Sequence, residues 1–189
     1  MKHVPLFLLH TVLFPGASLP LKVFEARYLD MVSDCLKREQ PFGVCLIRSG
    51  KEVGAAGQPH AVGTLAHIEK WEMPTPGILH ILVRGGERFA IRSHATQRQL
   101  VSAEVELWAP EPVLDVPARY ASLVEFLQEI QTQQPDPSSE AHFDDASWVG
   151  LRLAELLPVE NAIKQDWLVE RDPVARLASI LETLKLRAH

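Results

Sequence analysis

Residues 4–28 read VPLFLLHTVLFPGASLPLKVFEARY, and this stretch decides the fold. The apolar run over residues 4–14 predicts a first β-strand, and Pro15-Gly16 predicts the turn after it. Over residues 24–36 the apolar side chains recur at the i, i+4, i+7 spacing of an amphipathic helix. We therefore expect the chain to open with a strand, a turn and one early helix.

The same opening also has features of a secretory signal, because Met1-Lys2-His3 precedes the apolar run and small residues occupy positions 16–18. Pro5 and His10 interrupt the apolar run, however, and the segment before it carries one firm positive charge. We favour a structural strand in a cytoplasmic protein, with the signal as the alternative. No apolar run reaches the roughly 18 residues that a membrane-spanning helix needs, so no membrane partner is expected.

Beyond the early helix the pattern changes to short apolar runs, which are typical of β-strands. The connection over residues 72–77 and the pair Gly85-Gly86 are interpreted as turns. From Val101 to Leu107 every second residue is apolar. This alternation predicts a strand whose apolar side chains, at positions 101, 103, 105 and 107, face a core. Strands are expected over residues 42–48, 64–71, 78–84, 87–93 and 101–107.

After the proline-rich segment 109–112 the apolar spacing becomes helical. We therefore expect a β-rich domain at residues 1–112 and a helical domain at residues 113–189, an α+β fold. Asp115 and Pro117 are expected to begin the first helix of the second domain.

The remainder of the helical half is expected to form three more helices. Residues 131–140 are polar with two prolines and are interpreted as a mobile loop. The helices are expected over residues 148–157, over residues 159–169, and after Asp172-Pro173, which form a cap and a first turn.

The chain has 189 residues, with 19 Lys and Arg against 24 Asp and Glu, a formal net charge of -5. This charge argues against a dedicated nucleic-acid binder, because phosphate binding depends on a basic surface. Hydrophobic residues make up 47% of the chain, a share typical of a folded protein with a core. Cys35 and Cys45 have no metal-ligand spacing and are interpreted as reduced core residues, with a disulfide between them as the less favoured alternative.

The sequence lacks the motifs of enzymatic chemistry. Gly50-Lys51 is followed by Glu52, where a nucleotide-binding loop needs Ser or Thr. No GxSxG, SxxK or HExxH pattern occurs, and the eight His residues are dispersed. Glu104 and Glu106 are interpreted as the solvated face of a strand rather than as a catalytic pair. We expect no catalytic residues, no cofactor and no metal site.

The stretch at residues 4–28 resembles the opening of the N-terminal domain of ATP-dependent Lon (La) proteases. The likeness continues in the same order along residues 4–110, and it is weaker in the helical half, at Leu156-Leu157-Pro158 and Arg176-Leu177. Each motif alone is weak, but the ordered set is specific. The further motifs are Phe42-Gly43-Val44, Val62-Gly63-Thr64-Leu65-Ala66-His67-Ile68, Gly86-Glu87-Arg88-Phe89-Ala90-Ile91 and Ala103-Glu104-Val105-Glu106.

The resemblance implies a PUA-like β-pseudobarrel followed by a C-terminal helical bundle. In Lon proteases the ATPase and the Ser-Lys peptidase lie in later domains, so the resemblance implies a stand-alone, non-catalytic relative of the substrate-binding part. The implied partners are unfolded or tagged polypeptides or another protein client, with an adaptor role in protein quality control or regulated proteolysis. A second copy of the chain is a further partner that the resemblance implies.

Residues of the shared motifs also have structural explanations. Glu25 and Arg27 are expected in the first helical turn as a cap and an ion pair, while Phe24 and Tyr28 enter the core. Gly63 and Gly86 are expected to hold a backbone conformation that a side chain would block, or to lie where another part of the chain approaches closely. A mainly structural role is assigned to Pro15, Gly16, Glu25, Arg27, Tyr28, Gly43, Gly63, Thr64, Gly86, Arg88 and Phe89.

A peptide-binding domain needs large apolar side chains at its surface. Trp71 and Met73 lie at an expected turn, where polar residues are the ordinary choice, and Trp108 lies on the polar side of its strand. We expect Trp71 and Met73 in a groove between the two halves, with Phe143 and Trp148 as a further pair. Packing beneath the helical half is the alternative for each. The candidate peptide-binding residues are Trp71, Met73, Ile78 and Trp108.

RNA binding is the competing hypothesis, because PUA-like folds also occur in RNA-binding proteins. Four arginines, Arg84, Arg88, Arg92 and Arg98, lie close together in the sequence, and strand alternation predicts one face for Arg88 and Arg92. The net charge of -5 and the lack of interspersed aromatic residues make nucleic acid the less favoured partner.

Overall fold

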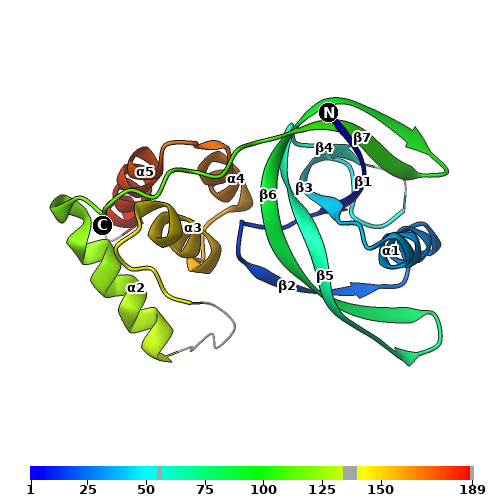
Figure 1. Ribbon diagram of the computed structural model, residues 1–189, viewed down its shortest axis with the longest axis horizontal. Helices are drawn as coiled ribbons and strands as arrows, with labels where there is room; N and C mark the ends of the chain where they lie inside the picture. The colour runs from blue at the N-terminus through cyan, green and yellow to red at the C-terminus, as the bar shows by residue number, and fades with distance from the viewer. Residues whose placement is uncertain (55–56, 134–139, 188–189) are drawn as a thin grey trace. The chain divides into compact units, whose positions relative to one another are not determined.

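The computed structural model describes residues 1–54, 57–133 and 140–187. The chain forms two compact units, Met1–Ala109 (unit 1) and Pro110–His189 (unit 2). Figure 1 shows that unit 1 is built mainly of strands and unit 2 of helices. The expected α+β fold, with one early helix and helices in the second half, is confirmed.

Unit 1 contains strands β1 Lys2–Leu9, β2 Ser18–Val23, β3 Phe42–Ser49, β4 Gln58–Pro59, β5 Val62–Thr75, β6 Ile78–Gln97 and β7 Leu100–Leu107, and helix α1 Ala26–Arg38. Its sheet closes on itself, because β1 pairs with β7 on one side and with β3 on the other, so that the ladder β1-β7-β6-β5-β3 returns to β1. The β1–β3 pairing is parallel, and the other pairings are antiparallel. Figure 1 shows these strands curving around a common centre with α1 beside them. The closed sheet is the expected pseudobarrel.

Strand β1 is buried on both faces. Val4, Leu6 and Leu8 belong to the core cluster inside the closed sheet. On the opposite face, the ring of Phe7 stacks on Tyr28 of α1 with ring centroids 3.9 Å apart. Burial of both faces explains why the strand is apolar at consecutive positions instead of alternating. A first strand is confirmed as β1, but it ends at Leu9 and not at residue 14 as the apolar run predicts.

Helix α1 begins at Ala26, later than its apolar spacing predicts. Phe24 therefore precedes the helix and is 53% exposed, so its predicted place in the core is wrong, whereas Tyr28 is buried as predicted. Glu25 occupies the N-cap position, but its side chain makes no capping hydrogen bond. Its carboxylate lies 3.2 Å from Nη2 of Arg27, which is the expected ion pair.

Strands β5 and β6 are longer than predicted. β5 continues to Thr75, so the turn consists of Pro76-Gly77 alone, with Gly77 at φ 81°. β6 continues for 20 residues through Gly85-Gly86, where a turn was expected. In β7 the predicted alternation holds from Val101 to Val105 but fails at Leu107, the last strand residue, which is 39% exposed.

Close packing, not a turn, explains the two glycines in β6. A Cβ atom at Gly85 would overlap the carbonyl oxygen of Phe14, and one at Gly86 would lie 2.6 Å from Nε2 of His67. Gly85 also donates its N–H to the carbonyl of Ala17 over 2.8 Å. At Gly85 the obstacle is backbone, so a side chain would separate the strand from its neighbours and glycine is required inside the continuous strand. At Gly86 the obstacle is the end of the exposed His67 side chain, which can turn away.

The centre of the pseudobarrel has the same requirement at Gly63. A Cβ atom there would lie 2.5 Å from Sγ of Cys45 and 2.7 Å from Cζ of Phe89. The neighbouring Thr64 is fully buried and donates its hydroxyl hydrogen to the carbonyl of Leu13 over 2.6 Å. This hydrogen bond ties the segment after β1 to β5.

Unit 2 contains a short 3₁₀ turn η1 Ala118–Tyr120 and helices α2 Ala121–Gln133, α3 Ala146–Leu156, α4 Asn161–Val169 and α5 Pro173–Arg187. The cap predicted at Asp172 is confirmed, because its Oδ1 accepts the backbone N–H of Val174 over 2.8 Å. Asp115 does not begin a helix as predicted; it forms an isolated bridge with Asp145, and η1 precedes α2. Of the predicted mobile loop, residues 134–139 lie outside the described residues. No helix in the described ranges is long and apolar enough to cross a membrane.

A buried ion pair joins the start of unit 2 to its last helix. Arg176 of α5 is fully buried, and its Nη1 donates to the carboxylate of Glu111 over 2.9 Å. The same carboxylate accepts the hydroxyl of Ser147 over 2.5 Å, while Nε of Arg176 donates to the carbonyl of Trp167 over 2.9 Å. One guanidinium therefore connects three segments of unit 2.

Replacing Arg176 with Met leaves the Glu111 carboxylate buried without its cation. The free energy of unfolding is expected to fall by about 3 to 5 kcal/mol, measured by urea denaturation followed by helical circular dichroism. Adding Glu111→Leu removes the second charge and is expected to restore part of the loss. A double variant as unstable as Arg176→Met alone would contradict the paired-charge explanation; the exposed Lys185→Met serves as the control.

Replacing Gly63 with Ala forces a methyl group against Cys45 and Phe89. We expect a loss of at least about 1 to 3 kcal/mol in the free energy of unfolding, because a packed core does not yield to an added group. Gly16→Ala is the matched comparison, since Gly16 has open space around its Cβ position and only a left-handed backbone at φ 77°. A larger loss at Gly16 than at Gly63 would show that backbone strain, not packing, governs these glycines.

Candidate functional site

Besides the N-terminal Met1, which is 94% exposed, four large apolar side chains of unit 1 are more than half exposed. These are Phe24 at 53%, Val53 at 54%, Trp71 at 61% and Met73 at 54%. Together we call them the apolar surface of unit 1. Large apolar groups gathered at a surface mark interaction sites more often than single exposed residues do.

Phe24 and Val53 border one pocket of about 300 Å³. Its lining is mainly apolar, with Phe7 from β1 and Leu21 from β2, and it also includes the charged residues Lys22, Glu25 and Glu52. Neither Phe24 nor Val53 was identified from the sequence. Placing the start of α1 at Ala26 would have predicted an exposed Phe24, because Phe24 then precedes the helix and is not part of its buried face. No pattern in the sequence predicts that Val53 is exposed.

Arg27 holds the border of this pocket in place. Its Nη2 donates to the carbonyl of Glu52 over 3.2 Å, and its Nη1 donates to the carbonyl of Gln99 over 2.8 Å. The Glu25 carboxylate accepts the backbone N–H of Gly54 over 3.3 Å. The segment that carries Val53 is thus fixed against the beginning of α1 by the Glu25–Arg27 pair.

Tyr28 forms the inner wall of the pocket. Burial raises the pKa of its hydroxyl, and the guanidinium of Arg27, with Cζ 4.5 Å from the ring centroid, acts in the opposite direction. The hydroxyl also accepts the backbone N–H of Leu8 over 3.4 Å. The phenol therefore stays protonated, so Tyr28 brings no charge to the lining of the pocket.

Trp71 and Met73 lie on the β5–β6 hairpin, which extends past α1 at the lower right of Figure 1. Ile78, the third candidate on this hairpin, is half-buried. Trp71 is paired with Ile81 of β6, and Ile81 is paired with Leu21 of β2. Directly paired residues share one face of a sheet, so Trp71 faces the same side as Leu21, about 10 Å away across β6.

Trp108 lies apart from this hairpin. It follows Leu107, which is paired with Phe89, whereas Trp71 is paired with a residue much earlier in β6. Trp108 is half-buried, and Cζ of Arg88 lies 5.0 Å from its ring centroid. Trp71 and Met73 therefore lie on one strand of the hairpin, Ile78 lies on the other strand with its side chain on the face opposite to that of Ile81, and Trp108 lies apart from all three.

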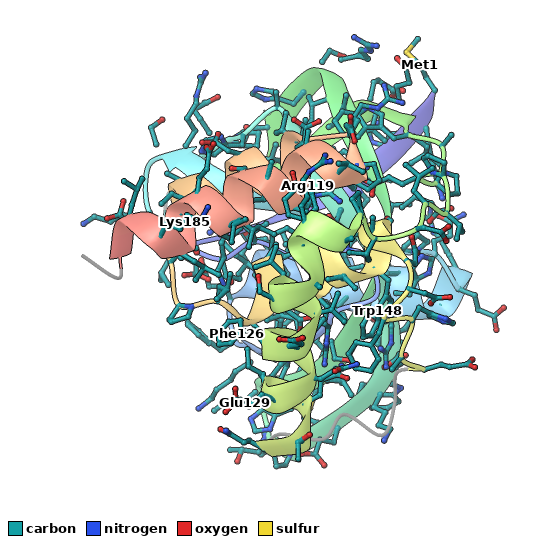
Figure 2. All side chains as sticks on the ribbon, turned by 90° about the vertical axis from the view of Figure 1, so that its left-hand side faces the viewer. Met1, Arg119, Phe126, Glu129, Trp148 and Lys185 are labelled. Carbon is teal, nitrogen blue, oxygen red and sulfur yellow. The ribbon has the colours of Figure 1, made fainter. Side chains whose placement is uncertain are left out.

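The remaining aromatic candidates belong to unit 2. Phe143 and Trp148 are half-buried and meet edge to face with ring centroids 5.3 Å apart. Figure 2 labels Trp148 on this unit, together with Phe126 and Glu129 of α2. The mutual packing of Phe143 and Trp148 accounts for part of their apolar surface.

Of the four arginines proposed for RNA, Arg84, Arg88 and Arg92 are engaged or buried within unit 1, whereas Arg98 is exposed. Nε of Arg84 lies 2.8 Å from Oε1 of Glu69, and Arg92 forms an ion pair with Glu106. Arg88 is 5% exposed, so it is not available on a surface with Arg92 as strand alternation predicted.

Neither cysteine is activated as a nucleophile, because a nucleophilic cysteine needs a lowered thiol pKa. Burial raises the pKa of the Cys35 thiol to about 11 and raises that of Cys45 further still. Both thiols are free and buried. Within the described ranges, no group of three or more His, Cys, Asp or Glu side chains could hold a metal ion.

Comparisons with known proteins point to one family. Residues 3–185 match the model of the ATP-dependent protease La (LON) substrate-binding domain. The structure is similar to a Lon N-terminal domain protein from Xanthomonas campestris, with a TM-score of 0.83 and 36% identity over 96% of this chain and 98% of that one. The N-terminal domain of Mycobacterium avium complex Lon protease shares the fold, with a TM-score of 0.68 and 18% identity over 96% and 97% of the two chains.

Two full Lon proteases are also similar in sequence. Those of Anaeromyxobacter dehalogenans and Paraburkholderia phytofirmans are 24% and 28% identical over 95% of this chain. The chain spans 21% and 24% of the length of these curated relatives. The match over nearly all of its residues shows that the chain belongs to the ATP-dependent protease La (Lon) substrate-binding domain family.

Proposed function

We propose that this chain binds exposed apolar segments of unfolded or tagged polypeptides through the apolar surface of unit 1. The observation that carries the proposal is the pocket between Phe24 and Val53, with Trp71 and Met73 exposed on the same sheet. Membership in a substrate-binding family supports it. The pocket receives one large side chain, and the hairpin residues contact the segment beside it.

The strength of apolar contacts explains how unfolded chains would be selected. Burying one large apolar side chain contributes about 1.5 to 3 kcal/mol, which alone gives only weak binding. A client with several apolar side chains in one extended segment fills the pocket and covers Trp71 and Met73 together. A folded protein with isolated surface apolar residues cannot do both, so it is rejected.

Ile78, half-buried on the neighbouring strand, and Trp108 are retained as separate contacts for a longer client. An adaptor role, in which this chain delivers clients to a separate protease, follows from binding without catalysis. We do not propose RNA binding, because Arg84 and Arg92 are paired with carboxylates and Arg88 is buried.

Replacing Trp71 and Met73 with Ser removes two contacts without emptying the core. We expect at least about tenfold weaker binding of a labelled peptide from an unfolded model protein, measured by fluorescence anisotropy. The melting temperature is expected to change little, because both side chains are exposed.

Phe24→Ser is expected to weaken the binding of the same peptide by a similar factor, because it removes an apolar side chain from the pocket lining. Val113→Ser is the matched control, since Val113 is 82% exposed but lies in unit 2. Equal affinity for the wild type and the Trp71/Met73 and Phe24 variants would exclude this surface. A steep loss of binding with salt would instead indicate a charged ligand.

We also propose that the chain hydrolyses neither peptides nor ATP. Gly50-Lys51-Glu52 lacks the hydroxyl residue of a nucleotide-binding loop, and both thiols are buried. Incubation of the pure protein with casein and ATP is expected to release no peptide and no phosphate above a heat-denatured control. An ATP-stimulated casein-cleaving activity that co-purifies with the chain would contradict the proposal.

A further inference from the structure

Strand β5 has two different edges. Along one edge it pairs with β6 from Val62 to Thr75. Along the other it pairs with β3 at Thr64, Leu65 and Ala66, and in the described part of the chain no strand pairing continues beyond them. The outer edge of residues 67–75 is therefore available to another strand, and all of these residues except the half-buried Ile68 are exposed.

Only a short part of this edge is regular. The register with β6 shifts between Ile68 and Lys70 and again between Glu72 and Thr75. Between these irregularities, Lys70, Trp71 and Glu72 pair in unbroken register with Leu82, Ile81 and His80. Bulges twist an edge away from a partner, and Pro74 lacks a backbone N–H, so neither flank supports a longer ladder.

The charges in the regular part are self-complementary. Lys70 and Glu72 flank Trp71 symmetrically and project on the face opposite to it, because side chains alternate along a strand. Glu72 is 73% exposed at its side chain, with His80 Nδ1 3.6 Å from its Oε1. When two such strands run antiparallel with Trp71 opposite Trp71, each Lys70 lies opposite a Glu72.

We propose that two copies of this chain pair along the outer edges of β5 about a two-fold axis at Trp71. The two indoles then meet on one face of the joined sheet, and two Lys70–Glu72 pairs form on the other. Opposite charges and aromatic pairs across antiparallel strands stabilise such a pairing, and like charges oppose it. A two-fold pairing uses the same surface on both copies and closes, so it produces a dimer and no fibre.

Charge also selects the register. If the axis lay at Lys70, two ammonium groups would face each other, and at Glu72 two carboxylates would do so. With the axis between Lys70 and Trp71, Glu69 would lie opposite Glu72. With the axis between Trp71 and Glu72, neither charge would have an opposite partner. Among the registers centred in this regular stretch, only the Trp71-centred one places each charge opposite its counter-charge.

This inference does not depend on client binding, although it uses Trp71. A peptide that covers Trp71 would compete with the second copy, so the dimer would be a resting form whose dissociation exposes the apolar surface. Failure of peptide binding would leave the pairing intact, and a monomeric chain would leave peptide binding intact. The two proposals therefore fail independently.

The test is a charge swap, measured by sedimentation equilibrium of the full chain without peptide. Lys70→Glu places one carboxylate opposite Glu72 at each end of the pairing, and Glu72→Lys places one ammonium group opposite Lys70 at each end. Each single change is expected to raise the dimer dissociation constant at least about tenfold. The double variant Lys70→Glu/Glu72→Lys restores opposite charges and is expected to return near the wild-type value.

Glu129→Lys is the control, because Glu129 is an exposed residue of α2 in unit 2, labelled in Figure 2, and is expected to leave the dissociation constant unchanged. All variants alter exposed side chains, so their melting temperatures should match the wild type. A wild-type chain that stays monomeric at millimolar concentration would overturn the proposal. Single charge reversals without effect, or a double variant no tighter than the singles, would also overturn it.

Discussion

The structure of unit 1 depends on the burial of β1 on both faces and along both edges. Inside the closed sheet Val4, Leu6 and Leu8 fill the core, and outside it Phe7 stacks on Tyr28. The same strand joins β7 to β3 and so closes the ladder. β3 pairs with β5 at Thr64, Leu65 and Ala66. The part of β5 after Ala66, together with the paired residues 78–84 of β6, therefore extends beyond the closed sheet. Closure thus creates the exposed hairpin that carries Trp71 and Met73.

The predictable elements were those whose signal is local. The first strand, the strand over residues 42–48 and the cap at Asp172 follow from apolar runs and short-range hydrogen bonding, and the structure has all three. Gly85-Gly86 does not form the predicted turn, because the reason for glycine at position 85 is the backbone of Phe14, far away in the sequence. Asp115 was misjudged as a cap because it bridges to Asp145. Contacts between distant segments cannot be obtained from the order of residues alone.

The candidate site shows the same division. Exposure of Trp71 and Met73 could be expected from their place beside a turn, although that turn is shorter than predicted. Phe24 and Val53 were missed because their exposure depends on where α1 begins and on the hydrogen bonds that Arg27 makes to a distant loop. Arg27 and Glu25, two motif residues, therefore fix the segment that carries Val53, and Glu25 also lines the pocket. Residues 24–27 therefore combine two roles: Glu25 and Arg27 fix the local structure, and Phe24 lines the proposed binding pocket.

The central claim is that the apolar surface of unit 1 recognises unfolded polypeptides. The most direct measurement is a backbone amide NMR titration of the full chain with a permanently unfolded model protein. Shifts concentrated at residues 20–25, 52–54 and 70–78, with α2 and α5 unaffected, are the predicted result. Shifts confined to unit 2, or to the arginine-bearing part of β6 after Gly86, would contradict the claim.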